Sequence, residues 1–202
     1  MKDFTTETAL LYSGGELMSK INKRLFSVDE YMRMAEAGIL SPVERVELIQ
    51  GEILVMSPIG PRHQAVIDRG TQTWVQILGG RAIVRGQGPA VLDRFAAPQP
   101  DLALLRPRED FYLHKHPGID DIFLIIEVSD SSLEYDTTVK QALYAILKIQ
   151  EYWVADLQNN RLLAYSDPQG DAYRTIREYH RGDSLAPLLL PDCRISVDVF
   201  LP

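Results

Sequence analysis

This chain of 202 residues contains very little cysteine and no long hydrophobic run. Its single cysteine, Cys193, excludes an internal disulfide framework and fits a reducing compartment. No apolar stretch reaches the roughly 18 residues that a membrane-spanning helix needs. Residues 1–5 also lack the basic start and apolar block of a signal peptide. We therefore expect a cytoplasmic protein that is not bound to a membrane.

The chain also lacks an excess of basic residues. Its 21 lysines and arginines are outnumbered by 28 acidic residues, which gives a net charge of −7 and a pI of about 5.1. This balance counts against tight, nonspecific binding of nucleic acid across the whole surface. Residues 62–108 are nevertheless rich in arginine. These arginines form either a local basic surface or a set of scattered, solvated side chains. These arginines are Arg62, Arg69, Arg81, Arg85, Arg94, Arg106 and Arg108.

Length and periodicity predict one domain with an arm. Residues 1–24 show no clear periodicity and are read as an N-terminal arm, and residues 25–202 as a single domain. We expect helices at 28–37, over about eighteen residues before Gly79, and at 137–147. The expected strands are 46–49, 52–56, 82–85, 90–93, 101–105, 122–128, 152–155, 161–165 and 173–179.

Three features of these elements determine the expected fold class. The run 122–128 is continuously apolar up to Glu127, as in a strand that is covered on both faces. The order strand, helix, strand over 122–155 predicts a parallel crossover. Hairpins at 46–56 and 161–179 add antiparallel strands. We therefore predict an α/β fold with a mixed sheet flanked by helices.

Three residues in the middle of the chain indicate a chemistry. Asp101 opens one apolar run, Glu127 closes the next, and Lys140 follows in a helical pattern. Carboxylates from neighbouring strand ends can hold Mg²⁺, and an ammonium beside them can stabilise charge on a phosphate. The order and spacing therefore predict a magnesium-dependent phosphodiesterase site.

Each of these residues also has a plainer interpretation. An aspartate at a strand start accepts hydrogen bonds from loop amides, as Asp101 would. A salt bridge alone would satisfy Glu127, whose buried charge is costly without a partner. Lys140 lies four residues after Asp136, so a simple helical ion pair accounts for both.

An ordered set of short motifs over roughly residues 25–180 resembles the putative restriction endonuclease family, a domain of unknown function in the PD-(D/E)XK nuclease superfamily. The motifs are Val46-Glu47-Leu48-Ile49-Gln50-Gly51-Glu52, Ser57-Pro58 followed by His63, Gln99-Pro100-Asp101, Ile126-Glu127-Val128-Ser129, Asp136 with Lys140, Ala142-Leu143-Tyr144, and Glu151-Tyr152-Trp153. In the commoner superfamily pattern the lysine lies two residues after the second acid, where this chain has Ser129. The family often has glycine where this chain has Thr138.

The resemblance implies a restriction-endonuclease-like fold and a hydrolase that cuts phosphodiester bonds in DNA. It implies that Asp101, Glu127 and the backbone carbonyl of Val128 hold Mg²⁺ or Mn²⁺, and that Lys140 positions water or stabilises charge. Glu47 would orient Lys140 or bind the metal through water, and His63 would contact phosphate.

Two other hypotheses remain open at this point. One is a catalytically inactive nucleic-acid-binding or assembly module with the same fold. The other is a structural protein in which Glu127 and Lys140 form a buried ion pair. If the protein is a nuclease, we expect a homodimer, because cutting two strands benefits from two sites related by twofold symmetry.

Overall fold

The computed structural model describes residues 23–41 and 43–202, so the predicted arm over 1–24 lies almost entirely outside the described residues. A six-stranded mixed sheet forms the centre of the molecule, in the order β3-β4-β5-β6-β7-β8. Strands β5 and β6 run parallel, as predicted, and the other neighbours are antiparallel. The strands are β3 (Ile83–Gly86), β4 (Leu102–Leu105), β5 (Ile122–Ser129), β6 (Glu151–Asp156), β7 (Arg161–Gln169) and β8 (Ala172–His180).

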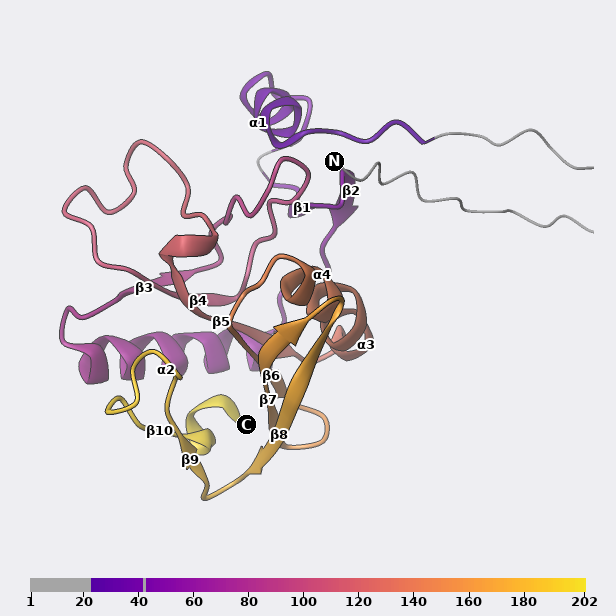
Figure 1. Ribbon diagram of the computed structural model, residues 1–202. Coiled ribbons are helices and arrows are strands. Elements are labelled where there is room, and N and C mark those ends of the chain that lie inside the picture. The colour runs from indigo at the N-terminus through magenta and orange to yellow at the C-terminus, as the bar shows by residue number, and fades with distance from the viewer. Residues whose placement is uncertain (1–22, 42) are drawn as a thin grey trace, which may run out of the picture.

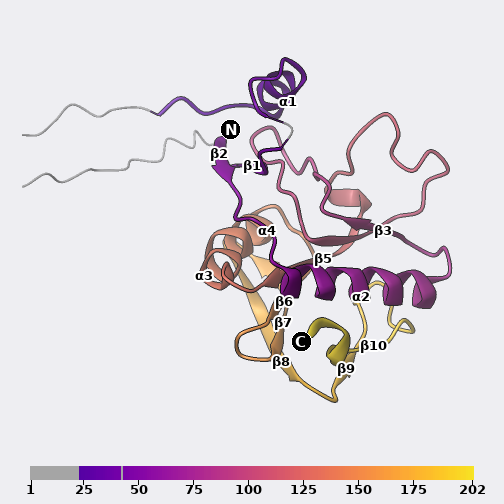
Figure 2. The same ribbon diagram turned by 180° about the vertical axis from the view of Figure 1, so that it is seen from behind.

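Helices cover both faces of this sheet, which confirms the predicted α/β class. Figures 1 and 2 show α2 and the C-terminal segment on one side of the sheet, and α3 and α4 on the other. The helices are α1 (Val28–Glu36), α2 (Pro61–Leu78), α3 (Leu133–Tyr135) and α4 (Gln141–Ile146). The C-terminal segment contains β9 (Ser184–Leu185), β10 (Ile195–Ser196) and the 3₁₀ turn Val197–Phe200.

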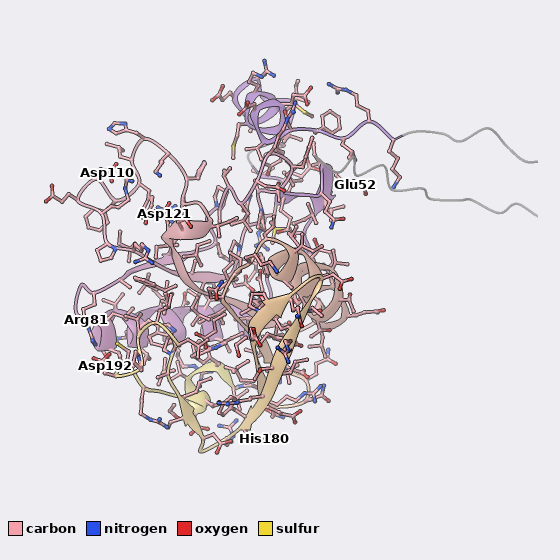
Figure 3. The ribbon with its side chains drawn as sticks, viewed as in Figure 1. Glu52, Arg81, Asp110, Asp121, His180 and Asp192 are labelled. Atoms are coloured by element: carbon pink, nitrogen blue, oxygen red, sulfur yellow. The ribbon has the colours of Figure 1, made fainter. Side chains whose placement is uncertain are left out.

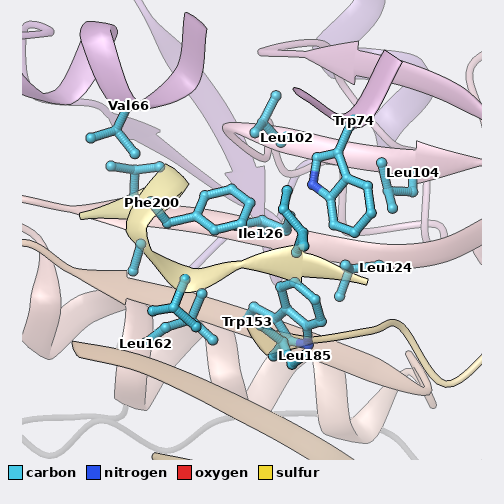
Figure 4. Close-up of a cluster of buried hydrophobic side chains, with 14 of the residues drawn as sticks. Val66, Trp74, Leu102, Leu104, Leu124, Ile126, Trp153, Leu162, Leu185 and Phe200 are labelled. Carbon is cyan, nitrogen blue, oxygen red and sulfur yellow. The ribbon is translucent and has the colours of Figure 1, made fainter. Parts of the chain in front are cut away.

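Alternation along the strands builds a separate core on each face. Leu102 and Leu104 of β4 point to the α2 side, where they join Trp74 and Trp153 (Figure 4). Ala103 of β4 and its neighbours point to the other side, where α4 packs. A side chain of β4 or β5 therefore packs either against α2 or against α4, depending on the face to which it points.

A hairpin of β1 (Val46–Ile49) and β2 (Glu52–Val55) packs beside the sheet, as predicted. Its turn residues Gln50 and Gly51 both have positive φ, at 49° and 80°. This combination matches the twist of two-residue hairpins. The predicted capping box at the start of α1 is also present, with Ser27 and Glu30 as reciprocal partners.

One predicted strand was wrong, and one predicted helix is present but begins earlier than expected. Residues 90–93 form no strand, and only an isolated bridge joins Asp93 to Ala96 in this described stretch. The helix predicted over 137–147 begins earlier, at Leu133, and contains a π-helical turn over Asp136–Lys140 before α4. Local propensity did not reveal either difference because both depend on partners elsewhere in the fold.

No helix within residues 23–41 and 43–202 combines the length and apolar character required to cross a membrane.

Candidate active site

The ends of β4 and β5 bring the two predicted acids together. Leu102 lies opposite Ile126 in the antiparallel ladder, so the next position along β5, Glu127, faces Asp101. Both residues share the face of Ala103 and Ile125, which is the α4 side of the sheet. Asp101 is 6% exposed and Glu127 is 2% exposed.

Backbone groups hold the two carboxylates in place. The amide of Asp101 donates to Glu127 Oε2 at 3.1 Å, and the amide of Val128 donates to Asp101 Oδ2 at 2.9 Å. Asp101 Oδ2 also lies 3.0 Å from Nε2 of His63, in the first turn of α2. Each acid is thus fixed by the strand that carries the other.

Lys140 lies between Glu127 and Glu47, and all three are almost completely buried. Its Nζ is 2.9 Å from Glu127 Oε1 and 3.3 Å from Glu47 Oε2. Tyr144, one helical turn later, donates its hydroxyl to the same Glu127 oxygen at 3.0 Å. Tyr135 donates to Glu47 Oε1 at 3.1 Å. The sequence-predicted residues Glu47, Glu127 and Lys140 therefore form one buried network.

Asp136 has partners of its own. Its Oδ2 accepts hydrogen bonds from the hydroxyls of Ser129 at 2.7 Å and Ser132 at 2.6 Å. The helical ion pair between Asp136 and Lys140 is therefore not the main interaction of either side chain: Asp136 accepts from two hydroxyls, and Lys140 pairs with Glu127 and Glu47. Both lie in the π-helical turn, and both are buried.

The network shifts the pKa values of its members in predictable directions. Burial raises the pKa of Glu127 well above its ordinary value, although the Lys140 ammonium opposes this effect. Burial would lower the pKa of Lys140, but the carboxylates of Glu127, Glu47 and Asp136 outweigh it and the pKa is raised. Lys140 therefore remains an ammonium at neutral pH.

A cavity of about 570 Å³ opens beside this network. Glu47, Asp101, Glu127 and Lys140 line it together with His63, from α2. Its other walls come from the segment after β2 and from the loop between β5 and α3. This volume is in the range of small-molecule and cofactor sites.

The donor set fits a hard divalent cation in its chemistry. Carboxylate and carbonyl oxygens are the ligands that Mg²⁺ prefers. The amide of Val128 points to Asp101, and the carbonyl of a strand residue lies on the same side as its amide. His63 contributes a buried Nδ1 that has no hydrogen-bond partner among the described residues.

The same side chains are, however, arranged as an ion network. Both oxygens of Glu127 already accept hydrogen bonds from protein donors. Within residues 23–41 and 43–202, no three or more His, Cys, Asp or Glu side chains are grouped as a metal site. Metal binding by Asp101, Glu127 and Val128 therefore stays a prediction.

Sequence reasoning missed the site roles of Tyr135 and Tyr144. Tyr144 follows Lys140 by four residues, so the two side chains lie on one helical face, and this spacing was the available signal. On the exposed face of α2, the amide of Gln64 donates to Asp68 Oδ1 at 2.8 Å, so these two polar residues bond to each other.

Many arginines of the segment 62–108 have partners within the chain. Arg81 pairs with Asp192, and the two lie side by side at one end of α2 in Figure 3. Arg108 binds Asp110 through two nitrogens, and Arg69 donates to the carbonyl of Leu201. These guanidinium groups attach loops and the C-terminal segment to the domain.

Comparison with known proteins shows which fold and which family this chain shares. A crystal structure at 1.96 Å resolution of a putative nuclease belonging to DUF820, from Anabaena variabilis ATCC 29413, is similar with a TM-score of 0.64. The likeness covers 87% of this chain and 97% of that one at 16% identity, which shows a shared fold. No curated protein matches the chain.

The sequence family described as "Putative restriction endonuclease" (Uma2) matches residues 28–198, which include every predicted site residue. This chain therefore belongs to the putative restriction endonuclease family.

Proposed function

We propose that this protein is a metal-dependent endonuclease that hydrolyses phosphodiester bonds in DNA. The observation that carries the proposal is the buried contact of Lys140 with Glu127, directly beside Asp101 and at the wall of a cavity. Membership of the putative restriction endonuclease family supports a nuclease. The order of the three residues along the chain supports the PD-(D/E)XK type of site.

In this proposal Asp101, Glu127 and the carbonyl of Val128 hold Mg²⁺ or Mn²⁺. When bound, such an ion lowers the pKa of a water molecule and polarises the phosphate. Lys140 donates hydrogen bonds to the attacking water or to a phosphate oxygen as negative charge develops. Lys140 needs no reorganisation for this role because Glu127 and Glu47 already fix its ammonium.

Glu47 and His63 have supporting roles in this proposal. Glu47 positions Lys140 and is itself fixed by the hydroxyl of Tyr135 and by the amide of Gln99. His63 orients the Asp101 carboxylate and lines the cavity, where its imidazole meets a phosphate oxygen. The carboxylates and Lys140 thus act on the phosphate while the outer residues hold them in place.

The test is nicking of supercoiled plasmid with Mg²⁺, with Mn²⁺ or with EDTA. We expect Asp101→Asn, Glu127→Gln and Lys140→Met each to lower the nicking rate about a hundredfold or more. Glu151→Gln is the matched control, because Glu151 is a buried carboxylate that contacts Trp153 on the opposite face of the sheet. Nicking in EDTA, or equal nicking by wild type and site variants, would contradict the proposal.

A specific observation favours the inactive-module alternative: both oxygens of Glu127 are occupied by protein donors. Salt-dependent DNA binding without nicking in either metal would support that alternative.

A further inference from the structure

Strand β8 is an edge of the central sheet. Within the described part of the chain it pairs with β7 alone, and its other side faces no strand. It is nine residues long, and Ile176 in its middle is 58% exposed. A long edge strand offers a row of backbone donors and acceptors to another strand.

The side chains of β8 are complementary to a second copy of the same strand. A twofold axis perpendicular to a sheet pairs residues of the same face, so an antiparallel pair of β8 strands must be centred on one residue. Centred on Ile176, the ladder sets Ile176 against its own copy. It also sets Arg174 against the partner's Glu178, twice.

The neighbouring registers are worse. A ladder centred on Arg177 places two guanidinium groups opposite each other, which is destabilising. A ladder centred on Thr175 places the apolar Ile176 against the partner's Arg174. Charge pattern and the exposed isoleucine therefore select one register.

The charged side chains of this register are available for such pairing. Arg174 is 65% exposed and lies 3.9 Å from Asp167, and Glu178 is 41% exposed and accepts a hydrogen bond from Arg161. Both are solvated surface contacts, which contribute little to the stability of one chain.

We propose that two copies of this chain associate through antiparallel pairing of β8, centred on Ile176. The pairing joins the two six-stranded sheets into one continuous sheet and covers the β8 edge of each copy. The interface lies three strands from β5, so it leaves the site cavity open. The proposal stands independently of the proposed nuclease activity.

Cysteine substitution tests the register directly. Ile176→Cys places two thiols across the axis, with Cα atoms about 5 Å apart, which suits a disulfide. Thr175→Cys and Arg177→Cys place identical residues about 8 Å apart, beyond that reach. The only native cysteine, Cys193, is buried and gives little background.

Val75→Cys is the matched control, because Val75 lies on α2 and is 56% exposed. Under mild oxidation at micromolar concentration, we expect Ile176→Cys to form disulfide-linked dimers at least tenfold faster than the other three variants. Cross-linking of Ile176→Cys no faster than Val75→Cys would overturn the interface. Faster cross-linking by Thr175→Cys or Arg177→Cys would overturn the register.

Sedimentation of the unmodified chain supplies a second measurement. We expect a dimer for the wild type, and an increase in dimer Kd of about tenfold or more for Ile176→Lys and for Arg174→Glu. The double variant with Arg174→Glu and Glu178→Arg should recover dimerisation, because it restores opposite charges. A monomeric wild type, or an unchanged Ile176→Lys, would overturn the proposal.

The two proposals can fail separately. Dimerisation is measured without DNA or metal, and Ile176→Lys should keep plasmid nicking per chain near the wild-type rate. Cross-linked dimers without nicking would contradict the nuclease proposal alone, and nicking by a strictly monomeric chain would contradict the interface alone.

Discussion

At the scale of single residues, the buried charge of Lys140 is stabilised by neighbouring carboxylates. The residue is 2% exposed, and its ammonium lies against two carboxylates, those of Glu127 and Glu47. A buried ion pair is weak evidence for stability, because desolvation offsets the attraction between its charges. Removing one partner is different, because it leaves the other charge buried and unpaired.

We expect Lys140→Met to lower the free energy of unfolding by about 3 to 5 kcal/mol at neutral pH. The loss should shrink toward pH 5, because protonation of Glu127, whose pKa burial already raises, removes an unpaired charge. Urea unfolding at several pH values measures both effects.

Lys148→Met is the control for this variant, since Lys148 is exposed and its ammonium donates a hydrogen bond to the carbonyl of Pro168 and forms no ion pair among the described residues. It should change stability by less than about 1 kcal/mol. If Lys140→Met and the wild type were equally stable at neutral pH, the carboxylates of Glu127 and Glu47 would carry no unpaired charge in the variant, which would contradict this prediction.

At the scale of elements, the β1–β2 hairpin brings Glu47 to the site. Its two-residue turn ends with Gly51 at a φ of 80°, where the backbone also passes close to Leu25. A Cβ at Gly51 would lie 2.7 Å from the Cβ of Leu25, which is too close for any real contact. Glycine is therefore required here both by conformation and by packing.

We expect Gly51→Ala to lower stability by about 2 to 4 kcal/mol, from strain at positive φ and from the clash. Gly79→Ala is the matched control, because Gly79 at the end of α2 has a φ of 55° and no neighbour within 4 Å of where a Cβ would lie. It should cost only about 1 kcal/mol. Thermal or urea unfolding compares the two, and equal costs would show that the Leu25 contact is unimportant.

The π-helical turn before α4 is another element that shapes the candidate site. It buries Asp136 and Lys140 together, and the hydroxyl of Tyr152 on β6 donates to the Asp136 carbonyl at 3.0 Å. Such turns are frequent at functional sites. We infer that contacts with the sheet, rather than helix propensity, maintain it.

At the scale of the whole molecule, Glu151 links the sheet to the C-terminal segment. Its carboxylate accepts hydrogen bonds from the indole of Trp153 at 2.8 Å and from the amide of Leu188 at 2.6 Å. Burial raises the pKa of Glu151 to about 7, although these two hydrogen bonds oppose the shift.

This pKa predicts how global stability changes with pH. The ordinary pKa of the group is 4.5, so the folded chain binds more protons than the unfolded chain between about pH 4.5 and 7. The contribution of Glu151 to the free energy of unfolding therefore falls as pH rises through this window, by at most about 3 kcal/mol.

Glu151→Gln removes this titration. We expect the stability of this variant relative to wild type to increase from pH 5 to pH 8, measured by urea unfolding at each pH. A constant difference across the range would contradict the raised pKa.

The sequence by itself determined the parts that depend on local chemistry. Capping at Ser27, the hairpin turn at Gln50-Gly51 and the apolar run of β5 were all predictable, because propensity and periodicity act over a few residues. The positions of Asp101 and Glu127 at adjacent strand ends followed from the same patterns.

Only the tertiary structure decided which charges meet. Lys140 pairs with Glu47, 93 positions away along the chain (140 − 47), and with Glu127, rather than with the nearby Asp136. Residues 90–93 have strand propensity but form no strand, because their backbone amides donate to the loop residues Ala96, Pro98 and Pro117 instead of to a neighbouring strand. Burial and pairing depend on contacts between distant segments, and those contacts exist only once the two cores have packed around the sheet.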